Sequence, residues 1–439
     1  MPRTLFYLLV VGNMVFPPTI AWPASGPNAP NLPGASGPLR APAAGTRAEN
    51  GPRSMSLSLA AALRLGRTQS PLLRAAEANL RAAAAGIRSA AAQQNPVLRV
   101  AHGAGRDTGG LDEDILLAQT IELGQKRSAA VSAAVAERDV TLAEVAQTAE
   151  DLSFNIRSAY YEALRADAER QLAADDLLTV QAFAQAAQAQ FQAGNVAQEQ
   201  VVRSNVEVAR AQQALDAAEV ERANRYAQLR SIVGLPEATA LTLTDRLDVI
   251  VRTYSLPEVL ELGLRNRPDV RAARLRREVL AAALRGVRAQ SRPDLVIEAR
   301  HETVSLATGG SSLVVGVTFP LLDLGRRRAD MRSAEARVAE QEASLDETAR
   351  AARLEIETAC RTLELSGRQV ASFEDGRLAQ AKQLLSMAQL SYEHGASSYL
   401  ELLDARQVYR TEQVSFARAR ADYHIALASL QRAVGGKLP

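Results

Sequence analysis

Two carboxylates, Glu401 and Asp404, are the side chains whose type and spacing could do chemistry in this chain. They follow Gly395 in the segment GASSYLELLD and are three residues apart. If this segment is helical, an i, i+3 spacing places both carboxylates on one helix face. Carboxylates gathered in this way attract cations and repel anions, because like charges add to the local potential. A solvated helix face that carries incidental acids is the alternative interpretation.

The other reactive side chains are too few or too scattered to form a catalytic or metal site. The chain has one cysteine, Cys360, which excludes an intrachain disulfide and a cysteine-based zinc site. The sequence shows no nucleophile constellation and no phosphate-binding loop. The four histidines have no metal-ligand spacing: His102, His301, His394 and His424. The sequence therefore predicts neither an enzyme nor a resident metal or cofactor.

The composition favours long, closely packed helices over a compact enzyme. Of the 439 residues, 47% are hydrophobic but only 4% are aromatic, whereas rings usually supply much of the buried area in a core. The 51 basic and 49 acidic side chains nearly balance, for a net charge of +2. That balance argues against nucleic acid as a partner, because binding phosphates requires a clustered basic surplus.

The beginning of the chain differs in composition from the rest. Arg3 precedes an apolar run from Leu5 to Val15, and small residues follow near Ala24, which is the order of a secretory signal. We therefore expect a signal peptide over residues 1–24. Residues 25–54 are rich in proline, glycine and alanine. A tract of this kind buries too little apolar surface to order itself, so we expect a flexible segment there.

The remaining sequence contains one pattern twice. Glycines at matching places are separated by 197 or 201 residues: Gly66 and Gly263, Gly124 and Gly325, and Gly194 and Gly395. Separations that stay this constant across several landmarks predict an internal duplication. We place the first copy at residues 55–245 and the second at residues 246–439.

Each copy predicts two short helices followed by a pair of strands. Apolar residues alternate with polar ones near 97–101 and 115–121 in the first copy, and near 295–299 and 313–319 in the second. A period of two indicates half-buried strands, so we expect four strands arranged as two hairpins. The triplet that begins at Gly309 is interpreted as the turn of the second hairpin.

A long helical hairpin is expected after each pair of strands. The stretch 126–233 contains no proline and a single glycine, Gly194. A helix from Lys126 to about Ala193 would be on the order of 100 Å long. Gly194–Asn195 and Gly395 are predicted to reverse the chain direction, because glycine adopts the left-handed conformation that ends a helix.

A membrane location would require the strands. The sequence has no second run of about 18 apolar residues, so entry into a membrane would take place through a closed β-barrel. Four strands cannot close a barrel, so several chains would have to share one. In that arrangement one face of the last strand would meet lipid: Leu313, Val315, Val317 and Phe319. The same alternation fits a buried sheet in a soluble coiled-coil protein, which is the alternative.

The chain resembles the TolC-type outer-membrane efflux proteins. The resemblance rests on the repeated order of short helices, strand pair, LG-x-(K/R)-R or LG-R-R-R segment, glycine reversal and closing VG, over roughly residues 55–436. It implies a mainly α fold with a β-barrel part, in which a homotrimer forms a periplasmic helical tunnel and a shared twelve-stranded barrel. It also implies a Gram-negative outer membrane and passive export, with a periplasmic adaptor and an inner-membrane pump of the RND type as partners.

Within that family the segment QTIELGQKR, Gln119 to Arg127, is similar to the CzcC-like branch that exports heavy-metal cations. That resemblance favours metal-ion export. Export of drugs or small organic molecules, or a type I secretion duct, remains an alternative of the same fold. A periplasmic coiled-coil adaptor or structural protein is the alternative from another class.

The resemblance also implies roles at the periplasmic entrance. It places Glu401 and Asp404 in an acidic ring around the pore and Tyr392 at a latch of the closed entrance. Ser397 occupies the position of a basic latch residue, so that ion pair is not expected here. The turns at Gly194, Asn195 and Gly395 would form the tips that contact the adaptor.

Overall fold

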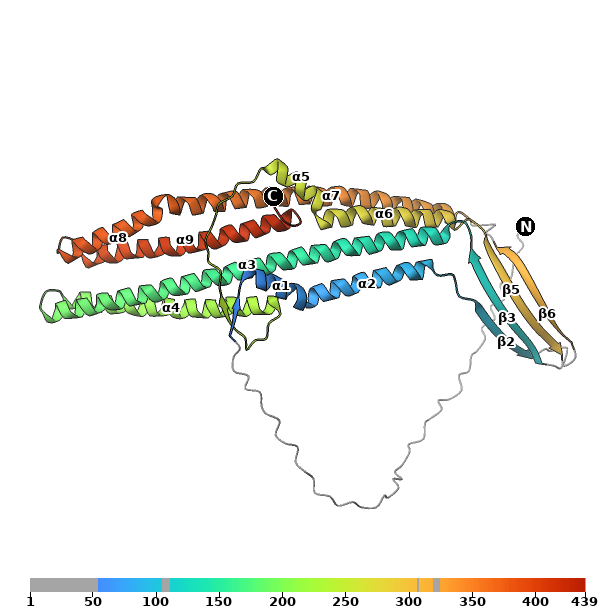
Figure 1. Cartoon of the computed structure of the whole chain (residues 1–439), viewed down its shortest axis with the longest axis horizontal. Helices are drawn as coiled ribbons and strands as arrows, with labels where there is room; N and C mark the ends of the chain where they lie inside the picture. Colours follow the sequence, from blue (N-terminus) through green and yellow to red (C-terminus); the bar gives the residue numbers. More distant parts are fainter. Residues whose placement is uncertain (1–53, 105–110, 306–307, 319–323, 439) are drawn as a thin grey trace, which may run out of the picture. The chain divides into compact units, whose positions relative to one another are not determined.

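The computed structural model describes residues 54–104, 111–305, 308–318 and 324–438. The expected signal peptide, and all of the proline-rich segment except Ser54, lie outside these residues. Within them the chain is mainly helical and carries one four-stranded sheet (Figure 1).

Two short helices, two strands and a long helical hairpin follow one another in this order in both halves of the described chain. The first half contains β1 (Ser54–Leu57), α1 (Leu59–Gln69), α2 (Pro71–Ala91), β2 (Val97–Ala104), β3 (Leu111–Glu122), α3 (Lys126–Gln192), α4 (Gln198–Val233) and β4 (Ala240–Leu243). The second contains α5 (Leu256–Asn266), α6 (Pro268–Ala289), β5 (Asp294–Ser305), β6 (Thr308–Thr318), α7 (Arg326–Ser372), the π-helical turn η1 (Phe373–Arg377), α8 (Leu378–Glu393) and α9 (Tyr399–Ala433). The predicted long helix and both strand pairs are therefore confirmed.

Local signals explain where the short helices begin. The Ser58 side chain accepts a hydrogen bond from the Ala61 N–H and caps α1, and the Ser70 side chain accepts one from the Leu73 N–H and caps α2. Pro71 occupies the first turn of α2, where the missing N–H costs nothing. Gly66 lies so close to α3 that a Cβ there would be 2.3 Å from Ile156 Cδ1. A larger residue at this position would have to displace the end of the Ile156 side chain for α1 to keep its packing against α3.

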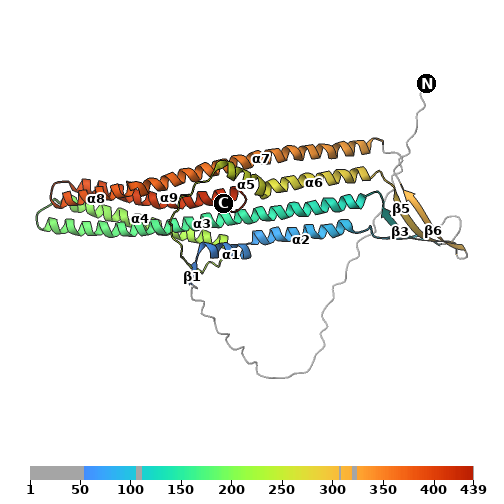
Figure 2. The same cartoon turned by 45° about the horizontal axis from the view of Figure 1, so that its top comes forward.

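The helices next to the sheet pack side by side in the order α2-α3-α6-α7. Next to the sheet, α3 lies between α2 and α6, and α6 contacts α7 (Figure 2). Farther from the sheet, α4 and α9 pack against α3, and α9 also contacts α7 and α8. The apolar side chains of Leu152, Ile156, Ala159 and Ala163 on α3 lie in the core.

The two predicted strand pairs form a single antiparallel sheet in the order β2-β3-β5-β6. The sequence predicted separate hairpins, but β3 and β5 also pair, with Ile115 opposite His301. Gly309 and its neighbours lie within β6, so the turn assigned to them was wrong and the strands are longer than expected. A further parallel pair, β1 with β4, was missed because each strand has only four residues.

The arm of the second half that leads from the sheet to the reversal at Gly395 is interrupted. Between α7 and α8 the chain forms the π-helical turn η1, in which Gly376 has a φ of 126°. Phe373 is buried there, with its ring 5.3 Å from that of Phe416 on α9. The corresponding arm in the first half, α3, is one continuous helix. None of the described helices combines the length and the apolar character needed to cross a membrane.

Candidate functional site at the helical tips

The two helical hairpins reverse at the predicted glycines. Gly194 and Gly395 have φ values of 77° and 69°. After each glycine a backbone N–H returns to the preceding helix: Asn195 donates to Gln190 O at 2.9 Å and Ala396 donates to Ser391 O at 2.8 Å. Both reversals lie at the end of the helices remote from the sheet, on the left of Figure 1. The predicted reversal points are therefore confirmed.

Glu401 and Asp404 lie on the first turns of α9, directly after the second reversal. The Ser398 side chain caps this helix by accepting a hydrogen bond from the Glu401 N–H at 3.3 Å. Both carboxylates are exposed, whereas Leu402 and Ala405 are each 2% exposed and face the neighbouring helices. Among the described residues neither carboxylate has a basic partner within ion-pair distance. Both are therefore free to interact with ions in solution.

A cavity of about 840 Å³ lies beside these carboxylates, between α4, α8 and α9. Its polar lining includes Glu401, Asp404 and Ser397, and its apolar lining includes Leu384, Met387 and Leu400. The three apolar side chains are 46%, 58% and 61% exposed. An open cavity that has exposed apolar side chains beside two neighbouring carboxylates is a surface that a partner could cover.

A buried ion network supports this end of α9 and was missed by the sequence analysis. Arg406 and Asp176 are 5% and 9% exposed, and Arg406 Nε lies 3.4 Å from Asp176 Oδ1. Arg410 Nη1 lies 3.2 Å from Asp176 Oδ2, and Arg406 Nη2 lies 3.7 Å from Glu207 Oε2. The network joins α9 to α3 and α4. The signal available in the sequence was the presence of charged residues at helix positions that are usually apolar because they pack against other helices.

Tyr392 joins the two hairpins close to their tips. Its hydroxyl donates to Gln190 Oε1 on α3 at 3.4 Å and accepts a hydrogen bond from the Gln200 side chain on α4. Its ring lies 5.8 Å from that of Tyr399. The Ser397 hydroxyl is buried and has no hydrogen-bond partner among the described residues. Amide side chains thus hold Tyr392, and Ser397 takes no part in the contact.

The two faces of the sheet differ in polarity. Leu313, Val315 and Val317 share a face with Ile297 and Leu117 according to the strand register. On β6 these three side chains are 72%, 64% and 55% exposed, while Phe319 lies outside the described residues. The sheet thus presents exposed apolar side chains on this face.

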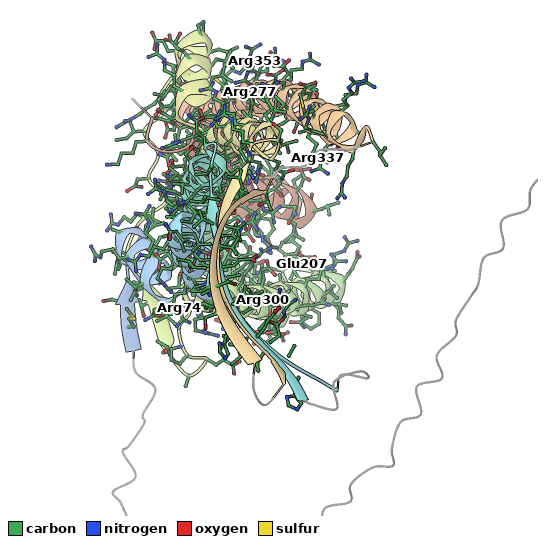
Figure 3. All side chains as sticks on the ribbon, turned by 90° about the vertical axis from the view of Figure 1, so that its right-hand side faces the viewer. Arg74, Glu207, Arg277, Arg300, Arg337 and Arg353 are labelled. Atoms are coloured by element: carbon green, nitrogen blue, oxygen red, sulfur yellow. The ribbon has the colours of Figure 1, made fainter. Side chains whose placement is uncertain are left out.

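The opposite face carries a group of paired charges. Asp114 Oδ1 lies 2.9 Å from Arg300 Nε, and Asp114 Oδ2 lies 3.4 Å from Arg99 Nη2. Arg300 also pairs with Glu302 at 2.5 Å. Figure 3 looks from the sheet end of the molecule and labels Arg300 beside the strands. The sheet therefore separates an exposed apolar face from a charged one.

Comparisons with known proteins identify a family. The family model described as outer membrane efflux protein matches residues 63–235 and 259–436. The chain is 25% identical to the cobalt-zinc-cadmium resistance protein CzcC of Cupriavidus metallidurans over 72% of this chain and 75% of that protein. It is 28% identical to the toluene efflux pump outer membrane protein TtgF of Pseudomonas putida over 53% of this chain and 50% of that protein. The solved structure of the outer-membrane channel OprN aligns with a TM-score of 0.75 at 21% identity, covering 86% of this chain and 90% of that one.

Proposed function

The chain belongs to the outer membrane efflux protein family, and from this premise we propose that it exports heavy-metal cations. It is an outer-membrane channel with a periplasmic tunnel and not an enzyme. Channels of this family are trimers that act with an adaptor and an inner-membrane pump. The choice between a duct and a periplasmic adaptor-like protein, left open by the sequence, is thereby decided in favour of the duct.

The similarity to CzcC carries the proposal of metal cations as cargo. That similarity extends over 72% of this chain and 75% of CzcC. The exposed, unpaired carboxylates of Glu401 and Asp404 support it, because cations passing the tips would meet negative charge. Export of organic compounds is the second candidate, and the resemblance to TtgF is the observation that favours it.

The acidic ring is part of the proposal. In a trimer, α9 of each chain would direct Glu401 and Asp404 toward a common axis, so that two carboxylates per chain surround the entrance. Carboxylates focused by a narrow channel raise the local cation concentration. The tips at Gly194, Asn195 and Gly395, with Tyr392 and Ser397 behind them, would contact the adaptor. The pump would be of the RND type.

The remaining parts of the chain fit the same proposal. The apolar side chains Leu313, Val315 and Val317, followed by Phe319, would face outer-membrane lipid. The signal peptide of residues 1–24 would direct export, and residues 25–54 would form a flexible segment. The two copies, residues 55–245 and 246–439, would each supply one hairpin and two strands to the trimer.

A deletion strain of the source bacterium tests the cargo. Growth should become sensitive to at least one of zinc, cobalt, cadmium and copper, and the wild-type chain supplied in trans should restore resistance. Sensitivity to toluene or a panel of drugs should stay unchanged. Sensitisation to organic compounds without any change toward metals would contradict metal export and select the second candidate. Unchanged growth under all of these conditions would contradict both.

A further inference from the structure

A basic cavity lies where the helices meet the four-stranded sheet. It has a volume of about 260 Å³ and opens between the beginning of α3 and the end of α6. Polar side chains line it from both elements: Gln125, Ser128 and Ser132 on one side and Arg285, Arg288 and Arg292 on the other. No acidic side chain is among the described residues that line it.

The cavity carries uncompensated positive charge. Arg288 Nη2 pairs with Glu335 Oε1 on α7 at 3.1 Å. Arg285 and Arg292 have no carboxylate partner within the part of the chain that the structure describes. The Arg292 side chain crosses over Gly124, where a Cβ would lie 2.2 Å from Arg292 Cδ. Glycine at position 124 therefore leaves room for the aliphatic part of the Arg292 side chain beside the cavity.

The cavity opens on the side of the sheet that is apolar. Lys126 Nζ lies 2.7 Å from Asp294 Oδ2, and Asp294 shares a face with Arg300 in the strand register. Lys126 therefore points to the charged side. At 100° per residue, Ser128 lies about 200° around α3 from Lys126. The hydroxyl-lined cavity is thus on the opposite side, at the helical end of the apolar face.

We propose that this cavity binds the anionic phosphate headgroup of a membrane phospholipid. The proposal rests on the placement of the apolar sheet face in lipid. The acyl chains would then follow this face, and the phosphate would meet the guanidinium groups at its edge. Arginine pairs with phosphate through charge-assisted hydrogen bonds, and basic residues at a membrane surface attract anionic lipids. The Ser128 and Ser132 hydroxyls donate to Gln125 O at 3.0 Å and to Ser128 O at 2.8 Å in this structure, and they would turn from these carbonyls toward the remaining phosphate oxygens.

Native mass spectrometry of the full-length trimer with defined lipids tests this site. The trimer should retain phosphatidylglycerol in preference to phosphatidylcholine. The variant Arg285→Gln/Arg292→Gln should retain about tenfold less phosphatidylglycerol, whereas Arg285→Lys/Arg292→Lys should keep most of the binding because the charge remains. Arg271→Gln/Arg274→Gln, which changes two exposed arginines at the other end of the same helix, should bind like the wild type.

Two results would overturn the proposal. The first is equal retention of both lipids, or unchanged retention in Arg285→Gln/Arg292→Gln. The second is displacement of the lipid by inorganic phosphate at millimolar concentration, which would assign the cavity to free anions. If the trimer forms and conducts ions in bilayers while either result is obtained, this inference fails and the channel function stands. If no membrane-inserted trimer forms, the placement of the sheet in lipid fails as well.

Discussion

Among single residues, Glu401 and Asp404 differ from two acids that contact another residue of the same helix, Arg406. Asp176 and Glu207 are held by arginines in a buried network, whereas Glu401 and Asp404 are exposed and lack a cation partner in the described chain. Acidic side chains near α9 thus have two roles, one on the buried side of this helix and one on its exposed side. Charge on the packed side holds helices together, and charge on the exposed side is available to ions.

We expect Glu401→Gln/Asp404→Asn to lower the cation-over-anion permeability ratio of the channel. The substitutions keep the side-chain shape and remove two negative charges per chain, so the local cation concentration at the entrance falls. Reversal potentials in planar bilayers under a salt gradient measure this ratio. Asp346→Asn/Glu347→Gln, which neutralises two exposed acids on α7, is the matched control. A ratio equal to that of the wild type in the tip variant would contradict the acidic ring.

A second residue-scale expectation concerns pH. Burial lowers the pKa of His424, and the Arg420 charge lowers it further, although Asp248 acts in the opposite direction. His424 Nε2 donates to the Asp248 carbonyl at 3.1 Å, and its ring stacks on Tyr161 at 4.2 Å. The folded protein therefore holds a proton on His424 less tightly than the unfolded chain does.

Stability should accordingly be full above the ordinary histidine pKa and fall as the pH drops below it, because the unfolded chain takes up more protons. We expect the thermal midpoint of the wild type to be lower at pH 5.5 than at pH 7.5. His424→Gln should show a smaller difference between the two pH values. Scanning calorimetry measures both midpoints, and equal differences in the two proteins would rule out His424 as the cause.

Among the elements, the contacts between the two hairpins decide how their tips are held. Arg406 on α9 reaches Asp176 on α3 and Glu207 on α4, and Tyr392 on α8 reaches the same two helices. One contact is buried and ionic, and the other lies closer to the tip and is made through side-chain amides. The two contacts should therefore respond differently to substitution.

We expect Arg406→Leu to destabilise the folded state by less than the roughly 3–5 kcal/mol that a fully unpaired buried charge costs, because Arg410 still contacts Asp176. Replacing Arg406 together with its most buried partner, as in Arg406→Leu/Asp176→Leu, should cost less than this single change, because the buried Asp176 carboxylate is removed as well. Urea unfolding monitored by circular dichroism gives the two free energies. A double variant less stable than Arg406→Leu would contradict a desolvated ion pair.

Tyr392→Phe should loosen the tips without unfolding the protein. The substitution removes the hydroxyl that contacts Gln190 and Gln200, and each lost hydrogen bond shifts the equilibrium toward separated tips by about 2- to 10-fold. Single-channel recording should show higher conductance or more frequent opening. Tyr409→Phe changes a tyrosine on α9 whose hydroxyl makes no hydrogen bond among the described residues. If both variants conduct like the wild type, Tyr392 is not a latch.

For the whole molecule, the edges of the sheet are the decisive feature. The order β2-β3-β5-β6 leaves β2 and β6 each with one unpaired side. An exposed edge presents free N–H and C=O groups that favour pairing with another chain. In a trimer, β6 of one chain would pair with β2 of the next, and no edge would remain.

Proline substitutions at two adjacent residues of β6 test this closure. On a free edge strand, successive N–H groups point alternately to the neighbouring strand and to solvent, so one of Val314→Pro and Val315→Pro would be tolerated. In a closed sheet both should abolish the trimer. Native mass spectrometry in detergent measures the trimer fraction, with Val314→Ala and Val315→Ala as controls. A wild-type trimer fraction in either proline variant would contradict pairing of β6 with a second chain.

The sequence alone determined the elements that depend on local patterns. Alternation near Val315 predicted a strand, the unbroken stretch after Lys126 predicted α3, and Gly194 and Gly395 predicted the reversals. Each of these signals lies within a few residues, because strand and helix periods and glycine φ preferences are local properties. The resemblance to TolC-type proteins rested on the order of these same signals.

Only the tertiary structure decided which elements meet. Pairing of β3 with β5 joined the predicted hairpins into one sheet, and β1 found β4 across more than 180 residues. The partners of Arg406 and Tyr392 come from α3 and α4, and no local pattern reports contacts at such separations. Burial and electrostatic pairing depend on the environment that the whole fold creates. For that reason the sequence located Glu401 and Asp404, whereas the structure showed that, unlike Asp176 and Glu207, they have no cation partner among the described residues.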